Sequence, residues 1–176
     1  MTDFENALKE TFDLEGGFSN DLNDRGGKTK YGITEFLLDV CIDRGYLPNM
    51  KIENITKGDA ELIYYKVFWE PLCLNEIQDK LITAEIFDTA VNSSGKKAVK
   101  IVQESLNFLG ENLKVDGLIG IQTLTLIKKW IQKDKKSLFK CLNGFQFINF
   151  VEIVKNDSSQ KTFSCGWMKR IQEYQI

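Results

Sequence analysis

A chain of 176 residues, 43% of them hydrophobic, can bury a sizeable core and fits one domain, or one domain with two lobes, better than two independent units. The complete absence of histidine excludes Ser-His-Asp and Cys-His catalysis and disfavours a zinc hydrolase. The net charge is −2, but residues 1–90 carry 18 acids and 9 bases, whereas residues 91–176 carry 7 acids and 14 bases. Such opposite charges suit either mutual attraction of two lobes or a basic surface for an anionic polymer.

Composition also bears on where the chain acts. No apolar run reaches the 18 or so residues that span a bilayer, and the opening MTDFENALKE has no basic or apolar region of a secretion signal. We therefore expect synthesis in the cytoplasm without a signal peptide and no stable membrane insertion. The cysteines lie far apart without CxxC spacing, so we predict buried free thiols, no metal and no other cofactor. They are Cys41, Cys73, Cys141 and Cys165.

Apolar periodicity predicts a mainly α fold. Thr2 and Glu5 form a capping-box pattern, and the first helix ends at Gly16-Gly17 with Glu15 at its end. The polar, glycine-rich residues that follow indicate a loop or small hairpin at about 16–33. Later helices are expected in 34–45, 56–68, 81–92, 94–109 and 124–131, from 137 onward and in 165–174, with a helix–turn–helix corner at 92–95 and a loop at 114–123.

The opening stretch holds the residues best suited to chemistry. Glu15 is followed after nine residues by Asp24 and after five more by Thr29, so a loop that folds back would bring a second carboxylate and a hydroxyl opposite Glu15. Two acids on either side of a glycosidic bond are what its hydrolysis requires. On these grounds alone, a plain turn and a calcium-binding loop remain open as well.

A family resemblance favours the catalytic interpretation. EGGFSNDLNDRGGKTKYGIT (15–34) closely resembles the start of the glycoside hydrolase family 108 muramidases, although Phe18 stands where the family often has tyrosine. The likeness continues in YYKVFW (64–69), FDTAVNSSGKKAVKIVQESL (87–106) and VDGLIGIQT (115–123) followed by GW..R, which resemble the peptidoglycan-binding segment that accompanies the family. It therefore covers nearly the whole chain.

The resemblance implies a lysozyme-like helical fold with a catalytic lobe at 1–92 and a peptidoglycan-binding lobe at 93–176. It implies hydrolysis of the β-1,4 bond between N-acetylmuramic acid and N-acetylglucosamine, as in phage endolysins and secretion-associated wall enzymes. Glu15 matches the catalytic acid, with Asp24 and Thr29 as the pair that positions water and stabilises the transition state. The implied partner is the peptidoglycan glycan strand rather than nucleic acid, and reaching the wall without a signal peptide would need a holin or an export system.

The proposed chemistry places demands on the surroundings of Glu15. To act as an acid near neutral pH, Glu15 needs apolar neighbours that raise its pKa, such as Phe18, Tyr31 or Phe87. A carboxylate supported by a hydroxyl suits direct attack by water, so we predict inversion, unless the carboxyl groups of Glu15 and Asp24 lie only about 5 to 5.5 Å apart.

A further set of residues is predicted to contact the sugar. The candidates are Phe18, Tyr31, Asp88, Asn92 and Gln103, with a core position for Tyr31 and helix capping for Asp88 and Asn92 as alternatives. The three tryptophans are expected in the core, and Arg170 is expected to pair with an acid of the first lobe. A lytic transglycosylase and a non-catalytic peptidoglycan-binding or secretion-assisting protein remain as alternative functions.

Overall fold

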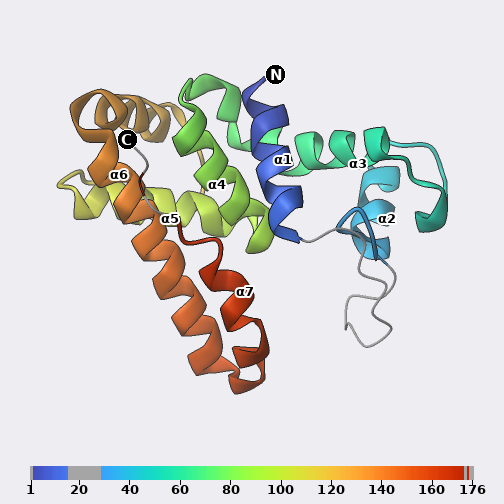
Figure 1. The fold of residues 1–176 in the computed structure, drawn as a ribbon. Helices are drawn as coiled ribbons and strands as arrows, with labels where there is room; N and C mark the ends of the chain where they lie inside the picture. The colour runs from blue at the N-terminus through green and yellow to red at the C-terminus, as the bar shows by residue number, and fades with distance from the viewer. Residues whose placement is uncertain (1, 16–28, 173, 175–176) are drawn as a thin grey trace.

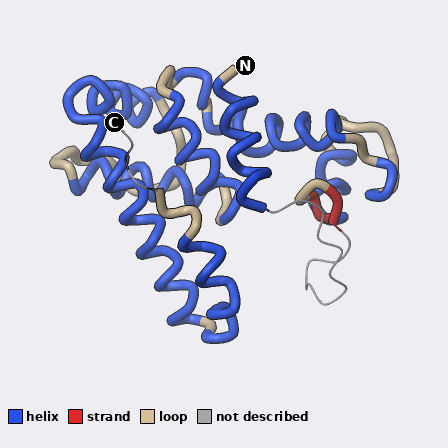
Figure 2. The backbone as a smooth tube through the Cα atoms, viewed as in Figure 1, coloured by secondary structure: helices blue, strands red, loops and turns tan. Residues whose placement is uncertain are grey.

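Figure 1 presents a computed structural model that describes residues 2–15, 29–172 and 174. Helices make up about three quarters of the described chain, and the strands form a single small hairpin (Figure 2). The elements in its first half are α1 (Asp3–Glu15), β1 (Thr29–Lys30), β2 (Ile33–Thr34), α2 (Glu35–Asp43), η1 (Ile52–Asn54), α3 (Lys57–Tyr64), the π-helix η2 (Tyr65–Trp69), η3 (Glu70–Leu72), η4 (Leu74–Glu76) and α4 (Lys80–Asn92). Those in its second half are α5 (Gly95–Phe108), α6 (Ile121–Asn156), η5 (Ser158–Phe163) and α7 (Ser164–Met168). The predicted mainly α, lysozyme-like fold is confirmed.

Helix starts follow the capping signals of the sequence. Thr2 and Glu5 exchange the two side-chain-to-backbone hydrogen bonds of a capping box at 3.2 and 2.8 Å. Thr34 Oγ1 accepts from the backbone of Leu37, and Ser94 Oγ accepts from Lys97. Each bond satisfies an amide that has no partner within its helix, which explains why local sequence places these starts correctly.

The helix α6 contains one sharp break. At Asp134 the backbone leaves the helical region, with φ −162° and ψ 79°. The Asp134 carboxylate then accepts hydrogen bonds from the backbone and hydroxyl of Ser137, at 3.0 and 2.6 Å, and so caps the next helical part. This agrees with the two helical patterns predicted for this region. Beyond the break, α6 and α7 project together from the body as an arm (Figure 1).

The prediction of one closing helix over residues 165–174 was wrong. The helix α7 ends at Met168, and the chain turns at Lys169 and Arg170. Two long-range contacts then hold the segment: Arg170 pairs with Asp88 of α4, and the backbone of Gln172 donates to Asn143 Oδ1 at 2.7 Å. These contacts replace the intrahelical hydrogen bonds that a longer helix would have made.

One continuous hydrophobic core joins both halves of the chain. The helix α4 packs against α1, α5 and α6, and the rings of Phe4, Trp69 and Phe87 meet edge to face with centroids 5.3 to 5.9 Å apart. Trp69 and Trp130 are core residues as expected, whereas Trp167 is half-buried in the arm and stacks on Phe150 at 5.1 Å. Burying each large ring contributes roughly 2 to 3 kcal/mol.

All four cysteines are free thiols, as predicted, but only Cys41 is buried, and Cys165 is exposed. Among the described helices, none is both long and apolar enough to cross a bilayer.

Candidate active site

The opening stretch ends in a hairpin whose two strands are joined by a two-residue turn. Thr29 pairs with Thr34 and Lys30 with Ile33, which leaves Tyr31 and Gly32 as the turn. Both turn residues have positive φ, 54° and 74°, as a type I′ turn requires. Tyr31 therefore occupies a backbone conformation that is uncommon for a residue with a side chain, and the residue is 37% exposed.

Contacts with α3 and η1 fasten this hairpin. The hydroxyl of Tyr64 donates to the carbonyl of Tyr31 at 3.3 Å, and Lys30 Nζ donates to the carbonyl of Glu53 at 2.7 Å. A Cβ on Gly32 would lie 2.5 Å from the Tyr64 hydroxyl, so only glycine allows this approach. Thr29, half-buried in β1, thus belongs to a strand pair that is anchored from two sides.

Three predicted residues lie outside what can be described at atomic detail. Glu15 is the last residue of α1, as expected. Phe18 and Asp24 lie outside the described residues, so the distance between the two carboxyl groups stays a prediction. Phe87, a candidate neighbour of the acid, is fully buried among Phe4, Tyr64 and Trp69.

Two of the predicted sugar contacts are instead engaged inside the protein. Asp88 is 4% exposed and accepts hydrogen bonds from Arg170 and, at 3.2 Å, from Gln146. The expectation that Arg170 pairs with an acid of the first lobe is therefore confirmed. Gln103 is 2% exposed, donates to Asp116 and to the Leu118 carbonyl, and accepts from the Gly117 amide.

The Gln103 contacts organise the loop that the sequence predicts after α5. They also stabilise the charged form of Asp116, whose pKa is lowered mainly by the Gln103 hydrogen bond.

Asn92, at the end of α4, is half-buried, and its Nδ2 is buried with no hydrogen-bond partner. Of the five predicted sugar contacts, Tyr31 is the one whose described side chain is exposed.

Sequence reasoning missed Glu85. This residue of α4 is 2% exposed, and neither carboxyl oxygen has a hydrogen-bond partner. Burial, and secondly the charge of Asp88, raises the pKa of Glu85 to about 8, while the nearby Asn143 side chain partly opposes this rise. The available signal was a glutamate three residues after the apolar Ile82, on the inward-facing side of a strongly apolar helix.

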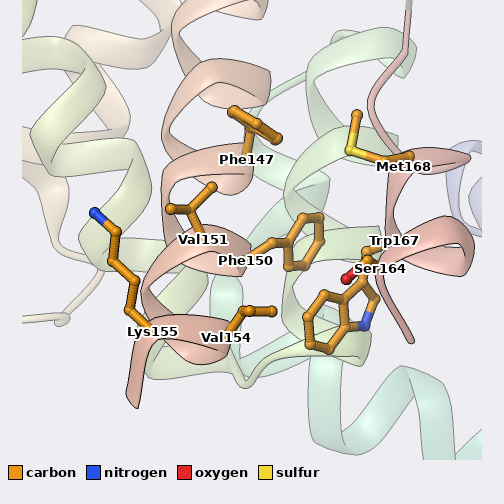
Figure 3. Close-up of a pocket in the computed structure, with 8 residues that line it drawn as sticks. All are labelled: Phe147, Phe150, Val151, Val154, Lys155, Ser164, Trp167 and Met168. Carbon is orange, nitrogen blue, oxygen red and sulfur yellow. The ribbon is translucent and has the colours of Figure 1, made fainter. Parts of the chain in front are cut away.

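A hollow lies in the arm formed by α6 and α7. It has a volume of about 220 Å³ and is lined by side chains of α6 and α7, which Figure 3 draws around it. The lining residues are Phe147, Phe150, Val151, Val154, Lys155, Ser164, Trp167 and Met168. Its lining is almost entirely apolar, so it lacks the convergent polar groups that acid–base chemistry needs. Within the described ranges, no three acidic or cysteine side chains gather as a metal site would require.

Comparisons with known proteins agree with this geometry. Residues 8–94 match the family model described as glycosyl hydrolase 108. Residues 97–172 match the one described as a predicted peptidoglycan domain. The chain belongs to glycosyl hydrolase family 108. It is thus a glycoside hydrolase that acts on peptidoglycan, and its second half carries the peptidoglycan domain.

The fold also matches a solved structure across almost its full length. SagA of Brucella abortus superposes with a TM-score of 0.75 at 25% sequence identity, over 96% of this chain and 88% of that one. No curated protein matches the chain significantly.

Proposed function

We propose that the protein is a muramidase that hydrolyses the β-1,4 bond between N-acetylmuramic acid and N-acetylglucosamine. Glu15 is the general acid, and Asp24 with Thr29 positions the attacking water and stabilises the transition state. The observation that carries this proposal is the pairing of a family 108 match with Glu15 at the end of α1 and Thr29 in the anchored hairpin. A carboxyl group beside a glycosidic oxygen and a second acid across the bond supply the proton and the water that hydrolysis requires.

In this proposal residues 1–92 form the catalytic lobe and residues 93–176 the binding lobe. The glycan strand lies where the acidic first half meets the basic second half. Tyr31 contributes an exposed ring, suited to stacking on a sugar, and Phe18 supplies a second ring from the opening stretch. Asp88 and Gln103 act behind the site, since their polar groups are buried and engaged.

We also propose inversion at the anomeric carbon. Water activated by Asp24 attacks the face opposite the leaving oxygen, which Glu15 protonates, and no covalent intermediate forms. NMR of the first products distinguishes the outcomes, because inversion yields the α-anomer before mutarotation and retention yields the β-anomer.

The primary test digests purified peptidoglycan with the wild type and with Glu15→Gln. A matched control, Glu61→Gln, removes an exposed carboxyl from α3. Soluble fragments are identified by mass spectrometry and a reducing-end assay. We expect reducing muramic acid ends from the wild type and the control, and a loss of at least about 100-fold in Glu15→Gln.

Other outcomes assign a different activity. Anhydro-muramic ends would identify a lytic transglycosylase. Binding to the wall by both proteins without fragment release would identify a non-catalytic peptidoglycan-binding protein. Activity that survives in Glu15→Gln would refute the assignment of the acid.

Access to the wall completes the proposal. The enzyme acts on cell-wall peptidoglycan, with a holin or an export system providing its passage, as for endolysins or secretion-associated enzymes. Expression in a bacterial cytoplasm with and without a co-expressed holin tests this step, with lysis expected only when the holin is present.

A further inference from the structure

A seam of buried polar side chains runs between α4 and α6, beside α1. It consists of Glu85 and Asp88 from α4, Asn143 and Gln146 from α6, and Arg170 from the turn after α7; all five are at most 7% exposed. We propose that this seam positions the end of α1 for the reaction, and that it does so only while Glu85 keeps its proton. The inference rests on the proposed function, because α1 ends at the proposed acid.

The fixed part of the seam is an ion pair that joins the two halves of the chain. Asp88 lies within the glycosyl hydrolase match and Arg170 within the peptidoglycan-domain match. Gln146 donates to the second oxygen of Asp88 at 3.2 Å, so the buried carboxylate has a cation on one side and an amide on the other. A pair satisfied in this way holds its elements in one arrangement, because moving either partner would strand a buried charge.

The seam reaches α1 through packing and charge. The helix α1 packs along α4, and Thr11 on α1 is 1% exposed. Partial burial and the charge of Asp88 raise the pKa of Glu10, the preceding residue. Glu15 lies one helical turn beyond Thr11. A shift of α4 would therefore displace the end of α1, and small misplacements of a catalytic group cost large factors in rate.

Glu85 is the weak point of this arrangement. Asp88 acts on it with a negative charge, and Asn143 of α6 offers it a neutral amide. Other groups nearby interact with Asp88 instead: Gln146 donates to that carboxylate, and the charge of Asp88 raises the pKa of Glu10 on α1. The buried face of α5 is uncharged, η2 presents aromatic rings, and the cation of the seam, Arg170, pairs with Asp88. An ionised Glu85 would thus add a second negative charge without a cation of its own.

Two states of Glu85 would avoid an unpaired charge or an unpaired polar atom in the seam. As the neutral acid, Glu85 can donate a hydrogen bond through its O–H. In the same seam, Gln146 Oε1 is a buried acceptor with no partner. As the carboxylate it needs water, which can enter only if α4 separates from α6. Ionisation of Glu85 should therefore loosen the packing of α4 against α6 and the ion pair between Asp88 and Arg170.

The test compares the wild type with two variants. Glu85→Gln keeps the size of the side chain but cannot ionise, and Glu85→Met can neither ionise nor form a hydrogen bond. Glu61→Gln is the exposed control. Activity on soluble glycan fragments is measured from about pH 5 to 10 at a temperature where each variant stays folded. The wild-type logarithm of kcat/KM should fall with slope 1 once Glu15 ionises and with slope 2 above about pH 8, whereas both Glu85 variants should keep slope 1.

A second readout does not depend on activity. Trypsin cleavage at Lys161 and Lys169, on either side of α7, is followed by intact-mass spectrometry at about pH 6.5 and 9. Cleavage follows the population of the opened segment, in which Glu85 ionises freely. We therefore expect the wild type to be cut faster than Glu85→Gln at both pH values, and the ratio of the two rates to grow more than about tenfold from pH 6.5 to pH 9. Comparing variants at one pH cancels the pH dependence of trypsin.

Each outcome decides one question. Equal slopes in an active wild type and Glu85→Gln would overturn the positioning role. Equal cleavage rates at pH 9 would overturn the opening of the seam. A wild type without glycosidase activity at any pH would refute the proposed function, and with it the role in the reaction, while the cleavage rates would still decide the response of the seam to Glu85.

Discussion

Replacing Glu85 with glutamine should stabilise the protein, although the substitution falls in the core. The pKa of Glu85 in the folded protein is about 8, against an ordinary value of 4.5. In the unfolded chain the carboxyl ionises freely above pH 4.5, whereas the folded protein must keep it protonated. Folding therefore loses stability as pH rises from about 4.5 to about 8, and the loss is constant above that.

The size of this effect follows from the shift. Each pH unit between the two values costs about 1.4 kcal/mol, so the burial of Glu85 costs about 3 kcal/mol at pH 7 and about 5 kcal/mol at pH 8. Glutamine does not ionise in either state and removes this cost. The gain should be near zero at about pH 4.5 and should raise Tm by roughly 10 °C at pH 8.

The assay is urea unfolding of both proteins at about pH 5 and 8, with Glu61→Gln as the control. The informative quantity is the difference between Glu85→Gln and wild type at the two pH values, because contributions from other groups cancel in it. We expect this difference to grow by about 4 kcal/mol from pH 5 to pH 8. An unchanged difference would mean that Glu85 is ionised and solvated in the folded protein, and the reasoning would fail.

Three further substitutions test the packing around the site, each by its change in the free energy of unfolding. Gly117→Ala should destabilise by about 1 to 3 kcal/mol, because φ is +75° and a Cβ would lie 2.9 Å from the Lys96 carbonyl; Gly144→Ala, with open space around it, is the control and should not destabilise. Gln103→Leu should cost about 1 to 3 kcal/mol and raise the pKa of Asp116, measured by NMR titration, and an unchanged pKa would contradict the assigned hydrogen bond. Trp69→Phe should cost about 2 kcal/mol through the lost Nε1 hydrogen bond and the space left behind, and a neutral effect would contradict its burial.

Local sequence determined the features that depend on near neighbours. Helix starts at Thr2, Thr34 and Ser94 could be predicted because a capping side chain satisfies amides only two or three residues away. The glycine-rich composition indicated a loop or small hairpin at about 16–33, and the structure places the strand pair at 29–34, with Tyr31 and Gly32 in a turn of positive φ. The composition excluded histidine-based chemistry, and the motif from Glu15 to Thr34 indicated the family.

Tertiary structure decided what depends on residues far apart in the chain. Asp88 and Gln103 have the polar side chains expected of sugar contacts, but helix packing buries them against partners 82 and 14 residues away. The closing helix ended early because Arg170 and Gln172 find partners outside it.

Glu85 is the clearest case of this division. Its sequence position gives no sign that both carboxyl oxygens lack a hydrogen-bond partner. Local sequence governs hydrogen bonds within a turn, whereas the solvation of a carboxyl group depends on every element packed around it. The sequence by itself therefore determined the helices and the chemistry available, and only the packing of α4 between α1, α5 and α6 decided which acid loses its water.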